Sequence, residues 1–182
     1  MIGITVSRRY AKALVKLLQR EDELETVGRY LRAFHELLEA SSELRAILLN
    51  PSIAMVVKRN IQRELLDRLQ PPPLARQFLD LLLEKNRLRY LGTIVFLYDQ
   101  LVNERLNRIY AKVTTRYPLA EKSAEEMRRR LSEVTGKSVI LRTEIDERML
   151  GGVLTEIGGI VLDGSVRGHL RAIRDELVRS AS

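Results

Sequence analysis

Apolar residues up to about position 106 recur every three or four residues, which is the spacing of helices that bury one face. The predicted helices span 6–20, 22–40, a short segment that ends at Leu49, 52–70, 74–84 and 88–106. The helix over 22–40 has the most regular stripe, formed by Leu24, Val27, Leu31, Phe34 and Leu38. Helices of these lengths with short connections indicate a six-helix antiparallel bundle.

Proline marks two breaks between these helices. Pro51 disfavours helical geometry at Asn50, and the run from Pro71 to Pro73 forms a stiff elbow. The helix between these breaks is predicted to bury one aligned set of apolar side chains, namely Ile53, Val57, Ile61, Leu65 and Leu69.

The hydrophobic spacing changes near Asn107 to the two-residue period of a strand. Alternating residues predict a strand over 109–117 and a second strand over 139–145. Between them, the sequence S-A-E-E beginning at Ser123 matches a capping box, and Gly136 is placed to end the helix that it starts. The first part of this region therefore reads as strand, helix, strand.

A Gly158-Gly159 pair separates the β-forming segments 153–157 and 160–162, which predicts a tight hairpin because both glycines can take positive φ. Asp163-Gly164-Ser165 is then predicted to break the strand, with positive φ at Gly164. Asp163 or Ser165 can cap the final helix, whose apolar face is formed by Val166, Leu170, Ile173 and Leu177.

The element order after Asn107 is thus β-α-β-β-β-α, an α+β arrangement. The whole pattern predicts a mostly helical α+β chain of two domains, a helical bundle over 1–105 followed by a small α+β domain over 106–182.

Composition narrows the class of protein. The absence of cysteine excludes disulfides and thiolate metal sites and, with no apolar N-terminal run, predicts a reducing cytosolic compartment. The sequence has no run of about 18 apolar residues, so we expect no membrane-spanning helix. The net charge of +7 is spread along the chain, whereas a nucleic-acid-binding protein usually clusters its basic residues. A solvated surface of mixed charge is the favoured interpretation.

Candidate catalytic groups are few. His35 and His169 each lack an Asp, Glu or His partner at metal-ligand spacing. The sequence holds no G-x-x-x-x-G-K-S/T phosphate-binding motif, and Gly151-Gly152 is typical of a turn. We therefore expect no catalysis, no cofactor and no metal ion.

Two predicted helices, 6–20 and 74–84, carry more apolar surface than one buried face needs. Each apolar arc covers roughly 200° at 100° per residue, against about 100° for a single stripe. Either both helices are central in the bundle, or together they form a groove for an amphipathic partner helix. The positions predicted to face that partner more than Leu14 or Leu17 lie off the centre of each arc: Ala11, Val15, Leu18, Leu79 and Leu83.

The sequence also resembles a known family. G-G-V over 151–153 and I-V-L-D-G-S-V-R-G-H-L over 160–170 resemble the C-terminal signature of the delta subunit of bacterial F-type ATP synthases. Its mitochondrial counterpart is the oligomycin-sensitivity-conferring protein. Further similar segments are R-R-Y-A-K-A-L over 8–14, E-K-N-R-L-R-Y-L over 84–91, T-R-Y-P-L over 115–119 and T-G-K over 135–137. Ala120 departs from the family, which often has a capping Ser there, so the helix start is expected to move to Ser123.

The resemblance implies a non-catalytic stator subunit of the proton-translocating ATP synthase, without cofactor or metal. Its helical domain would bind the N-terminal helix of an alpha subunit in a groove of the first and fifth helices, so that the catalytic head does not turn with the rotor. The groove residues implied in this chain are Tyr10, Ala11, Leu14, Val15, Leu18, Phe78, Leu79, Leu82 and Leu83.

The resemblance further implies that the C-terminal domain engages b-type peripheral stalk subunits. The stalk-binding or signature residues would be Gly152, Val153, Asp163, Gly164, Ser165, Arg167 and Gly168. Glycine early in a helix lowers helix propensity, so Gly168 predicts close approach of another backbone, either the hairpin or a stalk helix, with Arg167 beside it.

The expected location is the cytoplasmic face of the bacterial inner membrane, peripheral and with no nucleic acid bound. The alternatives are a basic nucleic-acid-binding module and a helical adaptor for another partner.

Overall fold

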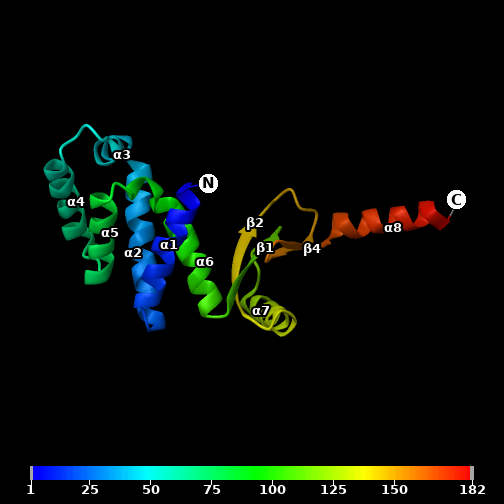
Figure 1. Cartoon of the computed structure of the whole chain (residues 1–182). Coiled ribbons are helices and arrows are strands. Elements are labelled where there is room, and N and C mark those ends of the chain that lie inside the picture. Colours follow the sequence, from blue (N-terminus) through cyan, green and yellow to red (C-terminus); the bar gives the residue numbers. More distant parts are fainter. Residues whose placement is uncertain (1, 181–182) are drawn as a thin grey trace. The chain divides into compact units, whose positions relative to one another are not determined.

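The computed structural model describes the backbone of residues 2–180 and the side chains of residues 3–175. The chain divides into two compact units, Met1–Leu106 and Asn107–Ser182 (Figure 1). The division falls where the hydrophobic spacing changes from helical to strand period. Each unit is described by itself below.

The first unit is helical (Figure 1). Ser41 lies before its third helix and its Oγ accepts a hydrogen bond from the Leu44 N–H at 3.2 Å. Pro73 occupies the first position of the fifth helix, where the missing N–H costs no hydrogen bond. The helices are α1 (Ile2–Leu17), α2 (Glu21–Ala40), α3 (Ser42–Leu49), α4 (Met55–Leu69), α5 (Pro73–Glu84), the short 3₁₀ helix η1 (Leu88–Tyr90) and α6 (Leu91–Arg105).

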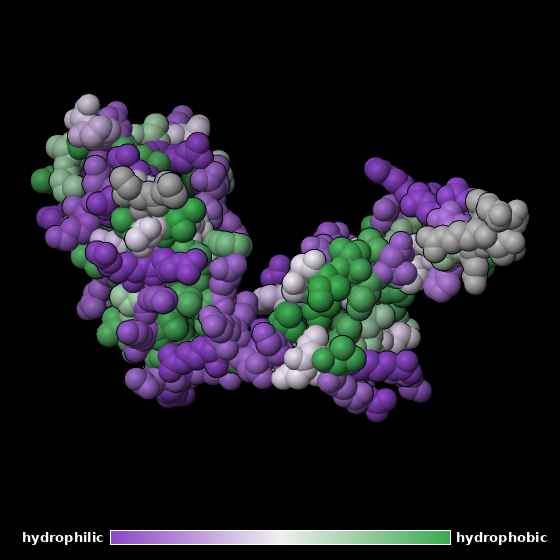
Figure 2. Space-filling view, turned by 45° about the vertical axis from the view of Figure 1, so that its right-hand side comes forward, coloured by the Kyte–Doolittle hydropathy of each residue, from purple (hydrophilic) through white to green (hydrophobic). Residues whose placement is uncertain are grey.

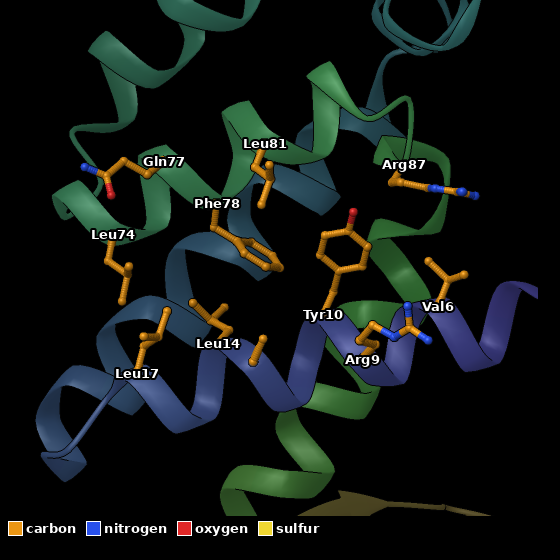
Figure 3. A pocket seen from close by; sticks show the side chains of 11 residues that line it. Val6, Arg9, Tyr10, Leu14, Leu17, Leu74, Gln77, Phe78, Leu81 and Arg87 are labelled. Carbon is orange, nitrogen blue, oxygen red and sulfur yellow. The ribbon is translucent and has the colours of Figure 1, made fainter.

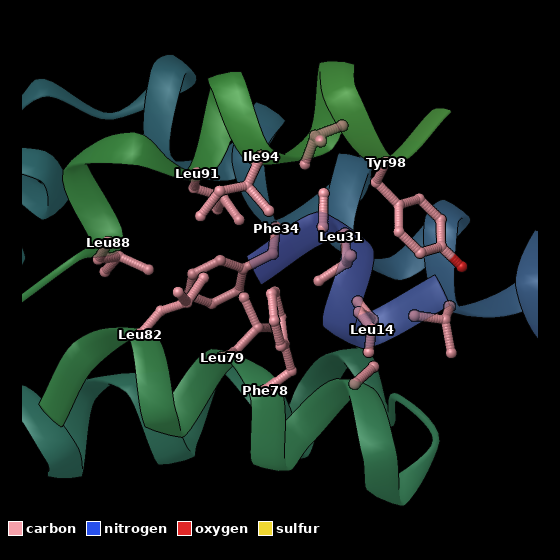
Figure 4. Packing of buried hydrophobic residues seen from close by; sticks show 14 of the residues in the cluster. Leu14, Leu31, Phe34, Phe78, Leu79, Leu82, Leu88, Leu91, Ile94 and Tyr98 are labelled. Carbon is pink, nitrogen blue, oxygen red and sulfur yellow. The ribbon is translucent and has the colours of Figure 1, made fainter. Parts of the chain in front are cut away.

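The core of this unit forms where apolar faces of α1, α2, α5 and α6 meet (Figure 4). The predicted stripe of α2 is buried along its whole length, which confirms that part of the pattern. Polar contacts also join these helices. The Tyr98 hydroxyl donates to the Leu24 carbonyl at 2.8 Å, and the Arg105 guanidinium donates to the carbonyls of Val15 and Leu18, each at 2.7 Å. Arg105 thereby satisfies carbonyls at the end of α1 that lack helical partners.

The predicted apolar face of α4 is found only in part, because Ile61, Leu65 and Leu69 are partly buried against the core but are not its most buried side chains. The buried side chains on this helix are Lys58, Gln62 and Leu66, whereas Val57 is 47% exposed. The Gln62 side-chain amide donates to Asp80 Oδ1 of α5 at 2.8 Å, so a polar contact sets which side of α4 faces inward. The most buried residues, Gln62 and Leu66, each lie one position after a predicted one, and one position corresponds to about 100° around the helix axis. The hydrophobic periodicity did not reveal this difference.

The second unit is an α+β domain with a mixed sheet. Its strands are ordered β2-β1-β3-β4, with β1 and β2 parallel and the other neighbours antiparallel. The predicted order of strands and helices is found. The elements are β1 (Arg108–Thr115), α7 (Glu121–Thr135), β2 (Ser138–Ile145), β3 (Gly152–Ile157), β4 (Ile160–Ser165) and α8 (Val166–Ser180) (Figure 1).

The helix α7 starts earlier than expected. Ala120 precedes its first residue without a side-chain cap, so the capping box at Ser123 and the shifted start are wrong. Its end is as predicted, because Gly136 has a φ of 66° and terminates the helix in the left-handed conformation. The core that this helix covers is small, and it consists of Ala111, Val139 and Ile157 with Ile109, Leu131 and Leu141 packed around them.

The hairpin between β3 and β4 has the expected turn. Gly158 and Gly159 have φ values of 58° and 83°, as a two-residue turn with positive φ at both positions requires. The strand β4 does not break at Asp163, however, and continues to Ser165. Gly164 pairs with Val153 in the ladder and is not among the positive-φ glycines, so the conformation predicted for it is wrong.

The positive φ near this turn is found on the neighbouring strand, β3. Gly152 has a φ of 83° and pairs with Ser165. A Cβ at Gly152 would overlap the Gly164 carbonyl oxygen. The position that requires glycine is therefore Gly152 on β3, where the φ is positive and the paired strand β4 leaves no room for a Cβ, and not Gly164 on β4.

Candidate partner-binding groove

An apolar groove lies between α1 and α5 and has a volume of about 490 Å³ (Figure 3). Tyr10, Leu14 and Leu17 extend into it from α1, and Leu74, Phe78 and Leu81 face them from α5 (Figure 3). The remaining lining residues are Val6, Arg9, Ala13, Gln77 and Arg87.

The floor of the groove is held by an aromatic contact between its two walls. The rings of Tyr10 and Phe78 meet edge to face, with centroids 6.2 Å apart and planes at 72°. Leu14 lies beneath and is 1% exposed, whereas Leu17 and Leu81 are 66% and 40% exposed on opposite walls. An apolar strip of this kind, continuous along two helices, is typical of a protein-interaction surface.

The structure brings together three of the nine predicted groove residues, Tyr10, Leu14 and Phe78. The other six lie in the core: Ala11, Val15, Leu18, Leu79, Leu82 and Leu83. The five residues predicted to face the partner more than Leu14 or Leu17 do not line this groove and are at most 8% exposed, whereas Leu14 and Leu17 do line it.

The physical reason is that α1 and α5 each have two apolar sides and one is needed for the core. The α1 helix packs against α6, and α5 packs against α2. Those neighbours take the sides that carry Ala11 and Leu79. An Ala11→Glu or Leu79→Glu change would therefore bury a charge in the core, since both side chains are 0% exposed.

Sequence reasoning assigned no partner-facing role to Leu17, Leu74 or Leu81, although all three belong to the wide apolar arcs. It also missed the polar rim. Arg9 and Arg87 lie at the end of the groove near Val6, and Gln77 lies toward the end near Leu74 (Figure 3). The Arg87 guanidinium also lies over the Tyr90 ring at 5.9 Å. No signal in the hydrophobic spacing marks such rim positions.

The signature residues of the second unit build the junction between β4 and α8. Ser165 caps α8 by accepting a hydrogen bond at its Oγ from the Gly168 N–H at 3.0 Å. Asp163 Oδ1 in turn accepts from the Ser165 N–H at 2.9 Å. Hydrogen bonds from the Ser165 side chain and backbone hold the pKa of Asp163 below its ordinary value. Of the two predicted caps, Ser165 is the one used.

The close neighbour of Gly168 is the Asp163 side chain. A Cβ at Gly168 would lie 2.8 Å from Asp163 Oδ2, so strand β4 of the hairpin occupies the space beside this glycine. The hairpin interpretation thus fits, with a side chain rather than a backbone as the neighbour. Arg167 is exposed next to this junction.

The second unit also exposes large apolar side chains, which gather on one face of it (Figure 2) and also include residues of α8. Ile160 and Leu162 of β4 pair with Ile157 and Thr155, and cross-strand partners project to the same face, so they share the face that α7 partly covers. The exposed side chains include Ile145, Leu150, Ile160, Val161, Leu162, Val166, Leu170 and Ile173.

Across the side chains that the structure describes, no three His, Asp or Glu residues are grouped to hold a metal ion. Within the described residues, no helix has both the length and the apolar character that crossing a membrane requires.

Comparison with known proteins identifies the family. The family model for the ATP synthase delta (OSCP) subunit matches residues 6–177. The chain belongs to this family. An ATP synthase subunit delta from Trichlorobacter lovleyi is 36% identical over 177 residues, covering 97% of this chain and 98% of the relative. Another from Anaeromyxobacter sp. strain Fw109-5 is 38% identical over 177 residues, covering 97% and 99%.

A chain of the Toxoplasma gondii mitochondrial ATP synthase hexamer has the same fold. It superposes with a TM-score of 0.64 at 22% identity and covers 94% of this chain and 97% of its own length. Membership in the delta (OSCP) family makes the chain a non-catalytic stator component of the F-type ATP synthase, a peripheral part of a membrane-bound complex. The comparisons support this assignment over the alternatives of a nucleic-acid-binding module or an unrelated adaptor.

Proposed function

We propose that this chain joins the catalytic head of the ATP synthase to its peripheral stalk by holding the N-terminal helix of an alpha subunit in the α1–α5 groove. The groove carries the proposal, because its walls at Leu17 and Leu81 are exposed and flank the aromatic contact between Tyr10 and Phe78. An amphipathic helix binds such a groove with apolar residues spaced by three and four. The subunit then transmits torque as a mechanical joint.

In this proposal, α1 to α6 act together as one antiparallel six-helix bundle over residues 1–105. Rigid walls favour binding because little conformational freedom is lost when the partner docks. The buried side chains beneath the groove, such as Leu14 and Leu79, hold α1 and α5 at a constant separation. The core thus sets the width of the binding site.

The second unit, over 106–182, binds the b-type stalk subunits in this proposal. Its support is the exposed apolar set on β4 and α8, which includes Leu162 and Leu170. The signature turn at Asp163 and Ser165 fixes where α8 starts, and Arg167 lies beside that turn. The chain then works at the cytoplasmic face of the bacterial inner membrane.

The groove assignment is tested with Leu17→Glu and Leu81→Glu in the full chain. Each change places a carboxylate on an apolar wall that is already exposed, so the fold should persist. We expect affinity for a peptide of the alpha-subunit N-terminus to fall at least about tenfold, corresponding to roughly 1.4 kcal/mol. Isothermal titration calorimetry measures it.

Val56→Glu is the matched control, because Val56 is 67% exposed on α4 and lies outside the groove. This variant should bind the peptide as the unaltered chain does. Equal affinity in all three variants, with unchanged circular dichroism, would reject the groove as the binding site.

The stalk assignment has a parallel test. Leu162→Glu should weaken binding to the C-terminal region of a b subunit, whereas Val134→Glu on α7, 85% exposed at a site away from β4, should not. A Leu162→Glu protein that still binds with full affinity would show that the stalk contacts another surface.

A further inference from the structure

The α1 wall of the groove carries positive charge that nothing on its own helix balances. Within Ile2–Leu17 the sequence has Arg8, Arg9, Lys12 and Lys16 and no Asp or Glu. A shallow depression on the outer side of α1 is lined by these four residues with Thr5 and Ala13, and it shares Arg9 and Ala13 with the groove. The basic strip therefore adjoins the groove, and Arg9 belongs to both.

The α5 wall differs. Its acidic side chains are directed to α4, since Asp80 accepts the hydrogen bond from Gln62 and Glu84 pairs with Arg59 at 2.8 Å. On its groove side α5 presents the uncharged Gln77 beside Leu74 and Phe78. The edge along α1 is thus cationic, whereas α5 itself adds no charge to its edge, and Arg87 adds a cation only at the end of the groove near Val6.

We infer that the helix that binds the groove is acidic along the edge that lies over α1 and uncharged along the edge that lies over α5. This inference rests on the proposed function and adds the chemistry of the partner to it. Apolar contacts at the floor supply most of the affinity, whereas the charged rim steers the approach of the helix and sets its rotation about its own axis. A helix with basic residues on that edge is repelled.

Lys12 and Lys16 are the specificity-determining residues in this arrangement. They are one helical turn apart, so carboxylates spaced by three or four residues on the partner can face both. Both lysines line the depression outside the apolar floor. Their removal should therefore change how fast and how selectively the helix binds more than how slowly it leaves.

The test uses the full chain and two synthetic amphipathic helical peptides with the same apolar stripe. One carries Glu along a single edge, and the other carries Gln at those positions. Association and dissociation rates are measured by stopped-flow fluorescence at 50 mM and 500 mM salt. The Glu peptide should associate about tenfold faster at low salt, and raising the salt should remove most of that advantage because charges across a rim are screened.

The variant Lys12→Gln with Lys16→Gln should lose most of the rate advantage of the Glu peptide at low salt, with part of it retained because Arg9 still lines the groove, and dissociation should change less than about twofold. Its control is Arg63→Gln with Arg68→Gln, which removes two exposed charges from α4 and lowers the net charge equally. The control protein should keep the preference for the Glu peptide. If the preference for the Glu peptide falls equally in both double variants, net charge rather than the position of the lysines causes it, and the inference is rejected.

The outcomes separate this inference from the proposed function. If neither peptide binds, or if Leu17→Glu leaves binding intact, the groove assignment itself is rejected and the inference falls with it. If both peptides bind the groove equally well, at rates that salt and the lysine changes leave unaltered, the groove stands and the acidic edge is rejected. A third peptide, with Glu on the opposite edge, would reject the assignment to α1 if it bound as fast as the first.

Discussion

The two units of this chain bury their apolar side chains to different extents. In the first unit, Leu31 and Phe34 of α2 are both 0% exposed within a core to which several helices contribute (Figure 4). In the second, Leu170 and Ile173 of α8 are 56% and 54% exposed. The sheet core there is limited to Ala111, Val139, Ile157 and their few neighbours.

This difference indicates how each unit depends on its partner. The first unit completes its own core and exposes the groove between α1 and α5, so it is expected to be stable before it binds. The second unit has one helix, α7, on a sheet whose β4 side remains uncovered. Because stability rises with the apolar area removed from water, the proposed contact with the stalk is expected to add stability to this unit.

Separating the units gives the largest expected effect. A fragment of residues 1–106 should fold and bind the alpha peptide, whereas a fragment of residues 107–182 should be marginally stable alone. The first fragment must keep Arg105, because its guanidinium caps α1 at the Val15 and Leu18 carbonyls. Urea unfolding followed by circular dichroism compares the fragments. An unfolded 1–106 fragment, or equal stability of the two, would contradict this comparison.

A second prediction compares phenylalanines within the first unit. Phe34→Ala should lower the free energy of unfolding by about 3–5 kcal/mol, because the side chain is fully buried and its removal leaves a cavity. Phe96→Ala on α6 is the control, since Phe96 is 61% exposed, and it should change stability by less than about 0.5 kcal/mol. Similar losses in both variants would show that the core is not where the structure places it.

A third prediction compares glycines within the second unit. Gly152→Ala should cost about 3 kcal/mol, since a Cβ there meets the Gly164 carbonyl at a positive-φ position. Gly159 has the same φ of 83°, but a Cβ added there would have no atom within 4 Å. Gly159→Ala should therefore lower the free energy of unfolding by only about 1–2 kcal/mol. Chemical denaturation of the full chain, with the second unit observed by NMR, gives both values. Equal costs would mean that β3 and β4 do not approach as described.

A fourth prediction uses pH. Burial, aided by Asp99, raises the pKa of Tyr98 well above its ordinary value of about 10, so the folded state keeps the hydroxyl neutral where the unfolded chain ionises. Its contribution to stability is therefore complete below about pH 10 and decreases as pH rises further.

Tyr98→Phe should lose about 1–2 kcal/mol at pH 7, since the Leu24 carbonyl loses its donor. The difference in stability between the two proteins should narrow above about pH 10. Urea midpoints at pH 7, 9 and 11 measure this, and a gap that stays constant through pH 11 would contradict it. Tyr30→Phe, at a partly buried tyrosine of α2, controls for a general effect of tyrosine ionisation.

The smallest expected effect concerns Gly168. Gly168→Ala should change the stability of the second unit by less than about 1 kcal/mol, because improved helix propensity offsets the displacement of Asp163. In an Asp163→Ala background the same change should become stabilising, since no carboxylate remains to be displaced. A double-mutant cycle measures this coupling. If the cycle shows no coupling, Asp163 is not the neighbour that limits this position. Affinity for the stalk should change little in either background.

Sequence periodicity determined most elements of this protein. The α2 stripe was predicted correctly because its narrow arc can face a core in one orientation only. The hairpin turn was equally well determined, since Gly158 and Gly159 are the residues that a two-residue turn with positive φ needs. The family resemblance rested on contiguous motifs and was confirmed by a match over residues 6–177.

Only the tertiary structure decided which sides of α1 and α5 are outside. Their wide apolar arcs are compatible with several orientations, and packing against α6 and α2 selected the one that buries Ala11 and Leu79 and exposes Leu17 and Leu81. The inward face of α4 and the glycine requirement at Gly152 depend in the same way on residues distant in sequence, namely Asp80 and Gly164. A local pattern records what each segment can bury, whereas the neighbours that pack against it determine what is left to bind a partner.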